Sequence, residues 1–375
     1  MSPEGAQLAL RGTVNDTSSR LTGPVRVVGA GLLGASVGLG LRARGVDVVL
    51  DDASPANLNL AVDYGAGRAS DGEESPALIV VCVPPDVTAA VVLAELAAHP
   101  DAVVTDVASV KVAPMAELEA SGRDIGRYVG SHPLAGRERG GPSSGRADLF
   151  VGRPWVVCTR PDVSRASVSL VEALVLDLGA TPIEMNTVAH DAAVALVSHT
   201  PQIVSSLMAK RLSGSSDAAL ALAGQGVRDV TRIASSEPEL WVQILGANAP
   251  AVVEILRAYR DDLDRVLIAL GDLDAPGARR SLAEELAGGN AGVSRLPGKH
   301  GQDRRFASVV VMVDDKPGEL GRLFTEMGEI GVNLEDLRLE HSPGAQIGLA
   351  EIAVLPEALK RTIDDLTARG WRIAG

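Results

Sequence analysis

Short runs of Val and Ile alternate with longer Ala- and Leu-rich stretches of helical spacing in the first half of the chain. Within residues 24–185 these apolar runs are continuous, as in strands buried on both faces of a parallel sheet. We expect strands at residues 25–28, 46–50, 78–83, 103–106, 128–131 and 155–158. Repeated strand-helix-strand units of this kind predict an α/β fold with a doubly wound parallel sheet of the Rossmann type.

Strand patterns disappear in residues 186–287, where apolar residues recur at three- and four-residue spacing. The clearest stripe comprises Trp241, Ile244, Leu245, Val252, Ile255, Leu256, Tyr259 and Leu263. This pattern predicts an all-helical domain. A helical region without its own sheet often buries an apolar face against a second copy, so we expect a homodimer, with a monomeric bundle as the alternative.

Strands return after an aperiodic, Gly-rich stretch at residues 288–304, which is typical of a flexible linker. Within residues 305–375 we expect strands at 307–313, 332–340, 346–354 and 371–374, with one helix after the first strand and another that begins at Pro356. The order βαββαβ predicts a small ferredoxin-like domain. At the other end, residues 1–23 are rich in Ser, Thr and Gly, and we expect a disordered tail.

The composition limits the classes of partner. Hydrophobic residues make up 46% of the chain and charged residues 22%, as in soluble globular proteins. The formal net charge of -13 disfavours nucleic acid and membrane surfaces, because both are anionic. The only cysteines, Cys82 and Cys158, do not suggest a disulfide framework, and no secretory signal or membrane span is apparent, so we expect a cytoplasmic protein. We expect no bound metal.

A Gly-rich turn, GAGLLG, lies directly between the first expected strand and an apolar helix. In this context GxGxxG indicates a dinucleotide site, because the glycines allow a tight turn, close approach of the pyrophosphate and close helix packing. A glycine turn without a ligand is the alternative. Two aspartates follow where the second strand ends; a carboxylate there binds ribose hydroxyls and repels a 2′-phosphate, which favours NAD over NADP. The expected cofactor residues are Gly29, Gly31, Leu32, Leu33, Gly34, Asp51, Asp52, Val83 and Pro84.

One histidine stands in the sequence SHPLAG at residues 131–136, in a turn just beyond the expected dinucleotide-binding half. An imidazole titrates near neutral pH, so His132 beside a bound nicotinamide could take a hydroxyl proton while a hydride leaves the same carbon. This combination suggests an oxidoreductase. The alternative is that His132 only caps a turn.

Four segments in order carry a family resemblance: TDVASVK at 105–111, SHPLAG, HDAAVALVSHTPQ at 190–202, and GVRDVTRIASSEPELW at 226–241. Their order and spacing closely resemble the prephenate/arogenate dehydrogenase family over residues 25–270. The resemblance implies NAD-dependent oxidative decarboxylation of prephenate to 4-hydroxyphenylpyruvate in tyrosine biosynthesis, or of arogenate directly to tyrosine.

The resemblance also implies roles for single residues. His132 matches the family's general base, and Ser109 matches the serine that orients this base and the substrate hydroxyl, although Ser109 could also be a helix N-cap. Arg232 matches the arginine that binds a substrate carboxylate, for which a guanidinium is suited. Arg228 lies four residues earlier, where it either binds substrate or braces Asp229.

Two positions in SHTPQ are expected near the substrate. His199 is assigned to the cofactor and substrate pocket, in a helix that Pro201 should kink. Gln202 stands where many family members have a second histidine, which leaves the choice between prephenate and arogenate open. We interpret the earlier His190 as a structural residue or one that begins a helix.

The last 70 or so residues resemble an ACT domain, a module that usually binds a small amino acid at a dimer interface. The resemblance rests on the βαββαβ order, on DKPGEL at 315–320 and on GVNL at 331–334. It implies a regulatory site, and we expect tyrosine to bind near Gly318, Glu319, Leu320 and Asn333 and to lower activity. The alternative is a ferredoxin-like domain kept only for dimerisation.

Two other functions fit parts of the sequence. A β-hydroxyacid or imine reductase would share the Gly-rich turn and a helical second domain, but such enzymes typically use a lysine on the first long helix. This chain offers His199 there, and Lys210 only near the helix end. A nucleotide-bound amino-acid sensor without catalysis is the other alternative.

Overall fold

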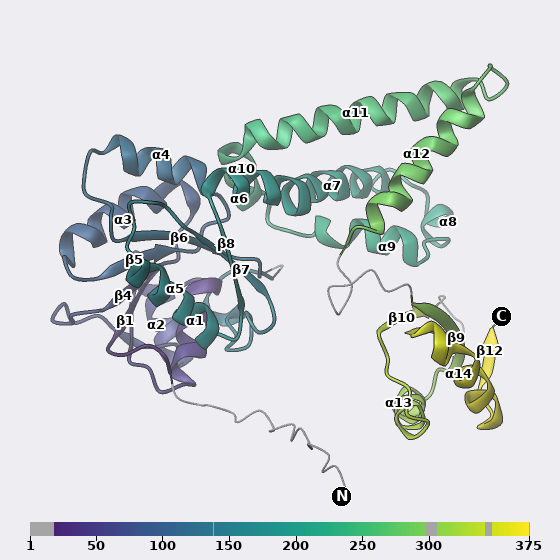
Figure 1. Ribbon diagram of the computed structural model, residues 1–375, viewed down its shortest axis with the longest axis horizontal. Coiled ribbons are helices and arrows are strands. Elements are labelled where there is room, and N and C mark those ends of the chain that lie inside the picture. The colour runs from purple at the N-terminus through teal and green to yellow at the C-terminus, as the bar shows by residue number, and fades with distance from the viewer. Residues whose placement is uncertain (1–18, 138, 297–305, 342–346, 375) are drawn as a thin grey trace, which may run out of the picture. The chain divides into compact units, whose positions relative to one another are not determined.

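The computed structural model describes residues 19–137, 139–296, 306–341 and 347–374 (Figure 1). The chain forms two compact units, each described by itself below. The first comprises Met1–Ile203 and Ser235–Leu256, and the second comprises Val204–Ala234 and Arg257–Gly375.

The first unit contains an eight-stranded sheet with the order β3-β2-β1-β4-β5-β6-β7-β8. Neighbouring strands from β3 to β6 are parallel, and the strand order reverses direction between β1 and β4, as in a Rossmann-type sheet. The strands are β1 (Val25–Val28), β2 (Val48–Asp51), β3 (Arg68–Ala69), β4 (Leu78–Val81), β5 (Val103–Asp106), β6 (Tyr128–Pro133), β7 (Pro154–Cys158) and β8 (Thr181–Met185). The predicted doubly wound parallel sheet is confirmed for the five expected strands β1, β2, β4, β5 and β6, and β3 is a short parallel strand that was not expected.

The last two strands differ from the prediction of a wholly parallel sheet. Strand β7 runs antiparallel to β6, and β8 is parallel to β7. A parallel neighbour requires a crossover, usually a helix, whereas the described part of the β6–β7 connection contains only the 3₁₀ turn Pro142–Ser144. The returning strand extends β6 through Pro133, so His132 lies in a strand and not in the turn that we expected.

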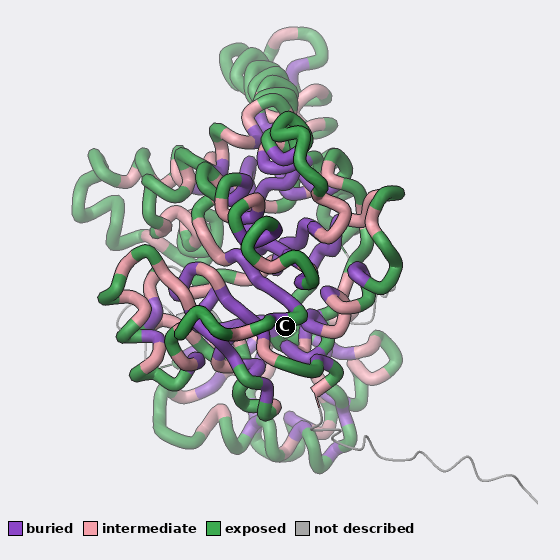
Figure 2. Tube along the Cα trace, turned by 90° about the vertical axis from the view of Figure 1, so that its left-hand side faces the viewer, coloured by how far each residue is buried: buried purple, intermediate pink, exposed green. Residues whose placement is uncertain are grey.

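Helices cover both faces of this sheet (Figure 1). One apolar core joins the sheet to α1 (Leu32–Arg42) and α5 (Arg165–Asp177), with the side chains of Leu78 and Val80. The other joins it to α3 (Pro85–Ala98) and α4 (Val112–Ala120), with Ile79 and Val81. Alternate residues of β4 therefore enter opposite cores, which is why its sequence is apolar throughout. Figure 2 shows that buried positions lie in the interior and exposed ones at the periphery. Helix α2 (Pro55–Asp63) follows β2.

Part of the tail that we predicted as disordered is ordered. Ser19, Arg20 and Leu21 all donate hydrogen bonds to the carboxylate of Asp177, which is buried at the end of α5. A buried carboxylate requires such donors, so it holds this segment against the sheet domain. Residues 1–18 of the predicted tail lie outside the described residues.

The region after β8 is helical, as predicted. Its helices are α6 (Thr187–Val194), a π-helical turn (Ala195–His199), α7 (Thr200–Leu212), α8 (Asp217–Leu220), α9 (Gln225–Thr231), a 3₁₀ turn (Arg232–Ala234), α10 (Pro238–Ala247), α11 (Ala249–Gly271) and α12 (Ala278–Val293). The helical run Thr187–Leu212 is long and apolar enough to cross a membrane by length and composition, a test that core helices of soluble proteins also pass.

The predicted linker begins too early. Helix α12 continues to Val293, and the N–H of Ser294 still donates to the carbonyl of Asn290. Glycine weakens a helix by about 1 kcal/mol per residue without ending it, so the Gly-Gly pair at 288–289 did not mark a boundary. Residues 297–304 of the predicted linker lie outside the described residues.

The C-terminal domain follows the order βαββαβ and contains a four-stranded antiparallel sheet with the order β10-β11-β9-β12. Its core contains Val311, Leu323, Met327 and Leu366, all fully buried. The elements are β9 (Ala307–Asp314), α13 (Glu319–Glu329), β10 (Asp336–His341), β11 (Ile347–Val354), α14 (Pro356–Ala368) and β12 (Arg372–Ala374).

Candidate active site

The Gly-rich turn connects β1 to α1 in a conformation that only glycine fits. Gly29 has φ = +96°, and a Cβ atom there would lie 2.4 Å from the carbonyl oxygen of Cys82. A Cβ atom at Gly34 would lie 1.9 Å from the carbonyl oxygen of Gly29. The turn is therefore packed tightly against both the neighbouring strand end and its own helix.

The start of α1 is free to bind an anion. Its N-cap, Gly31, makes no side-chain hydrogen bond, the first turn contains no acidic residue, and a Cβ atom at Gly31 would meet nothing within 4 Å. The N–H groups of this first turn, which includes Leu32 and Leu33, fit a pyrophosphate. Val83 lies beside Gly29 at the end of β4, and Pro84 is the N-cap of α3. The expected cofactor residues thus meet at one edge of the sheet.

The two aspartates after β2 have different surroundings. Asp51 pairs with the guanidinium of Arg26 at 2.5 Å. Asp52 turns toward the Gly-rich loop instead: one carboxylate oxygen accepts the N–H of Ala30 at 2.6 Å, and the other accepts the N–H of Ser54 at 2.7 Å. A carboxylate beside the phosphate-binding turn is where the adenine ribose is held in this fold, so the geometry favours Asp52 as the ribose ligand.

His132 belongs to a chain of buried side chains. It pairs with Val156 of β7 through the backbone, and its Nδ1 lies 2.9 Å from Nε2 of His190 on α6. Nδ1 of His190 in turn lies 2.7 Å from a carboxylate oxygen of Asp191. His190 is fully buried and His132 is 8% exposed. The structure therefore joins the candidate base to a residue that we had interpreted as merely structural.

A second buried network, centred on Asp106, holds β6 in place. The carboxylate of Asp106 accepts hydrogen bonds from the Tyr128 hydroxyl at 2.8 Å and from the N–H of Ala108 at 2.9 Å, and it pairs with the ammonium of Lys111. The hydroxyl of Ser131 donates to the carbonyl of Asp106 at 2.7 Å. A paired, hydrogen-bonded charge of this kind is expensive to rearrange, so it holds the strand that carries His132 in one position.

Burial lowers the pKa of His132 well below its ordinary value, and electrostatic interactions with His190, Lys111 and His199 lower it further. The imidazole is therefore neutral near pH 7, which is the state a general base requires. Within the described ranges, no group of three or more His, Cys, Asp or Glu side chains is placed to hold a metal ion.

His199 ends the π-helical turn that precedes Pro201. Proline lacks an N–H and clashes in a regular α-turn, and the wider turn accommodates it. Nδ1 of His199 lies 3.1 Å from Nδ2 of Asn248, which also donates to the carbonyl of Asp191 at 2.8 Å. The ring meets Trp241 edge-on, and burial lowers the pKa of His199 to about 4.

Ser109 lies half-buried in the bend between β5 and α4. It forms no hydrogen bond with His132 in the described part of the chain, and it is not the helix N-cap that we gave as its alternative, because α4 begins after Lys111. The carboxylate of Asp191 accepts the N–H groups of Lys111 and Val112, at 2.8 and 2.9 Å. Asp191 thus replaces a local cap.

The other expected substrate residues are divided between the two units. Gln202 is buried near the start of α7, in the first unit. Arg228 on α9 and Arg232 in the following 3₁₀ turn belong to the second unit, where both are exposed and neither forms an ion pair with a described residue. Asp229 pairs with Gln225, at 2.8 Å, and not with Arg228.

Sequence reasoning missed His190, Asp191 and Asn248 as parts of the site. The adjacent His-Asp pair at the start of a helix was the one available signal, because a carboxylate beside a histidine often orients it. The contact between His190 and His132 spans 58 positions, and that between Asn248 and the carbonyl of Asp191 spans 57. Only the folded chain brings these residues together.

Comparisons with known proteins give family matches over most of the chain. The family model for the nucleotide-binding domain of prephenate dehydrogenase matches residues 37–184, and the model for its dimerization domain matches residues 186–284. A probable prephenate dehydrogenase from Streptomyces niveus is 36% identical over 355 residues, which cover 92% of this chain and 98% of that protein.

Two crystal structures resemble most of the chain. Prephenate dehydrogenase from A. aeolicus, in complex with hydroxyphenyl propionate and NAD+, is 25% identical with a TM-score of 0.65, and the match covers 74% of this chain and 99% of that one. Synechocystis arogenate dehydrogenase is 27% identical with a TM-score of 0.58, and the match covers 72% and 99%.

Replacing Asp52 with Asn should raise the KM for NAD+ by about 10-fold or more, since hydrogen bonds to a charged group contribute about 1.5–3 kcal/mol. The Asp51→Asn variant is the matched control: it should lower the free energy of unfolding by breaking the pair with Arg26, with little effect on this KM. Steady-state kinetics with NAD+ and urea unfolding measure both. A larger KM change in Asp51→Asn than in Asp52→Asn would contradict the assignment.

Proposed function

The chain belongs to the prephenate dehydrogenase family, and from this we propose that it converts prephenate to 4-hydroxyphenylpyruvate with NAD+ as the oxidant. The observation that carries the proposal is the buried, neutral imidazole of His132 in the same rigid sheet as the Gly-rich turn. The reductase interpretation has no support here, because Lys210, which a related reductase would use, is exposed in the last turn of α7.

In this reaction the protein mainly positions the substrate and transfers a proton. Nε2 of His132 takes the proton of the ring hydroxyl as the C–H bond at the same carbon breaks. NAD+, which the Gly-rich turn and Asp52 would hold, would supply the acceptor for the hydride. Carbon dioxide then leaves the opposite ring carbon, its bonding electrons make the ring aromatic, and the new phenol oxygen takes a proton back from His132. A positioned base contributes about 10²- to 10⁴-fold to such a step.

The sheet sets the distance between the two ends of the cofactor site. Strand β6, with His132, lies three strands away from β1, or about 14 Å at the usual spacing of parallel strands. With the adenine ribose at Asp52, the nicotinamide end extends toward the strands on the other side of β1. This is the side on which His132 lies.

We assign the substrate carboxylate to Arg232, with Arg228 as a second cation. Both are exposed and unpaired with any described acidic residue, so each is available to an anion in a chain with a net charge of -13. Arogenate remains the alternative substrate, because the neutral side chain of Gln202 near the start of α7 does not select between a keto acid and an amino acid.

We also propose a cytoplasmic homodimer. The family model matched by residues 186–284 is a dimerization domain. On α11 a stripe of large apolar side chains is exposed, comprising Tyr259, Leu263, Leu267 and Leu270. A contiguous apolar face of this kind marks an interaction surface, which a second copy would cover. The free thiols of Cys82 and Cys158 are compatible with a reducing compartment.

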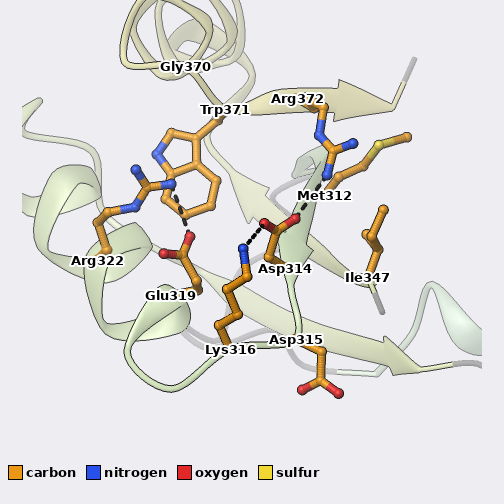
Figure 3. Close-up of a pocket in the computed structure, with 10 residues that line it drawn as sticks. All are labelled: Met312, Asp314, Asp315, Lys316, Glu319, Arg322, Ile347, Gly370, Trp371 and Arg372. Carbon is orange, nitrogen blue, oxygen red and sulfur yellow. Dashed lines mark hydrogen bonds and ion pairs between the residues drawn. The ribbon is translucent and has the colours of Figure 1, made fainter. Parts of the chain in front are cut away.

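For the C-terminal domain we propose an ACT-like regulatory role with an aromatic amino acid as effector. A pocket of about 770 Å³ opens beside β9, α13 and β12, and its charges are balanced (Figure 3). Arg322 stacks on Trp371 at 4.1 Å from the ring centre and pairs with Glu319, while Lys316 pairs with Asp314. Both signs of charge beside an indole ring suit a zwitterion with an apolar side chain.

The four residues that we expected at the effector site are divided. Glu319 lines this pocket, whereas Gly318 and Leu320 line a smaller one of about 130 Å³ on the same loop. Asn333 lines neither pocket and donates to Glu335 at 2.9 Å.

Incubation with prephenate and NAD+ should produce NADH and 4-hydroxyphenylpyruvate, and His132→Asn should lower kcat by about 10²- to 10⁴-fold with unchanged NAD+ affinity. His99→Asn, at a histidine outside the site, is the control. Parallel assays with arogenate and NADP+ identify the preferred pair. Absence of product with both prephenate and arogenate, or full activity in His132→Asn, would refute the proposal.

Light scattering should give twice the mass of one chain. The Leu267→Asp variant should have the mass of a single chain, because a buried aspartate at an apolar interface is strongly unfavourable. Val87→Asp, at an exposed apolar position on α3, should leave the dimer intact. A monomeric wild-type protein would exclude the dimer.

Calorimetry should detect tyrosine binding, and tyrosine should lower turnover. Arg322→Ala should weaken this binding by about 10-fold, since cation–π and charged contacts are worth 1–2 kcal/mol in such a site. Basal activity should not change in this variant. If no aromatic amino acid gives a heat of binding, the proposed regulatory role is wrong.

A further inference from the structure

We propose that His190 is a positioning residue for the reaction, and that the chain Asp191–His190–His132 holds His132 in the tautomer with hydrogen on Nδ1 and a free lone pair on Nε2. The inference rests on the proposed function only where it treats His132 as the base. The hydrogen-bond geometry carries the rest.

The direction of both hydrogen bonds follows from the carboxylate of Asp191, which ends this series of side chains. An ionised carboxylate accepts and never donates, so Nδ1 of His190, at 2.7 Å from Asp191, must carry a hydrogen. We take His190 as neutral, so that its Nε2 carries no hydrogen and can only accept. The contact of 2.9 Å with His132 therefore requires hydrogen on Nδ1 of His132. What remains on His132 is an Nε2 lone pair, the group that a general base uses.

Rigidity makes this assignment effective. Asp191 is 4% exposed, and the N–H groups of Lys111 and Val112 hold its carboxylate in place. His190 is fully buried, and its ring meets that of His132 edge-on, with planes at 76°. In the other tautomer two lone pairs would face each other where no water can intervene. The hydrogen-bonded side chains of Asp191, His190 and His132 form a relay, which therefore selects one tautomer of His132 before any substrate binds.

The main-chain carbonyl of Asp191 sets the opposite tautomer at His199, through Asn248. The carbonyl of Asp191 accepts one hydrogen from Nδ2 of Asn248, and this orients the amide. The same nitrogen lies 3.1 Å from Nδ1 of His199, which must accept. His199 then carries its hydrogen on Nε2 and is a neutral donor. Asp191 thus specifies one accepting and one donating imidazole.

The tautomers can be read directly in protein labelled with ¹⁵N-histidine, by long-range ¹H–¹⁵N correlation of the imidazole rings at pH 7. The chain has six histidines, and single His→Gln variants assign the signals. We expect His132 to be protonated at Nδ1 only and His199 at Nε2 only. A His132 with hydrogen on Nε2, or a mixture of both forms, would overturn the proposal. This measurement needs no substrate, so it stands apart from any failure of the prephenate assay.

Kinetics separate positioning from packing. His190→Leu keeps an apolar side chain but removes the acceptor, and kcat should fall about 10²-fold while the affinity for NAD+ is unchanged. In His190→Gln the Oε1 atom can take the place of Nε2, so at least about 10-fold of this loss should return. His99→Leu, at a partly buried histidine paired with Glu95, is the matched control and should be neutral.

Equal losses in His190→Leu and His190→Gln, or a kcat in His190→Leu within about 3-fold of wild type, would show that His190 only fills space. If His190→Leu does not fold, the tautomer of the wild-type protein and its change in His190→Gln still decide the question. A protein with the expected tautomers and no turnover of prephenate would refute the proposed function and leave the relay in place.

Discussion

The hydrogen bonds between the carboxylate of Asp191 and the first N–H groups of α4 are the constraint on which the site depends. Helix α4 has no side-chain cap of its own, and an uncapped, buried helix start is unfavourable. Asp191 satisfies this need from 79 and 80 positions later in the chain, so α6 must lie at the end of β5. That position delivers the adjacent His190 to the ring of His132.

Burial explains why the polar groups here act as one unit. Asp106, Lys111, His190 and Asp191 are almost inaccessible to solvent, and each has a partner. In a low-dielectric interior water cannot replace a lost hydrogen-bond partner, so each hydrogen bond stabilises the neighbouring hydrogen bonds of the network. The same burial keeps the imidazoles of His132 and His199 neutral. One physical cause thus sets both their position and their charge.

Much of the fold and part of the site could be predicted. The Gly-rich turn was readable because its glycines answer local steric demands, such as the 1.9 Å approach at Gly34. The reversed direction of β7 was not, because strand direction depends on whether a crossover helix covers the sheet, and a run of Val and Ile is the same either way. For the same reason His132 was expected in a turn, although pairing with β7 extends its strand.

The amino-acid sequence by itself determined the alternation of strands and helices, the phosphate-binding turn and the candidate base, because these depend on neighbours within a few positions. Only the tertiary structure decided that Asp52 and not Asp51 faces the turn, and that His190 and Asn248 orient the two histidines. Those choices depend on hydrogen bonds between residues that are 22 to 58 positions apart. Such partners are selected by the packing of whole elements, which no local pattern records.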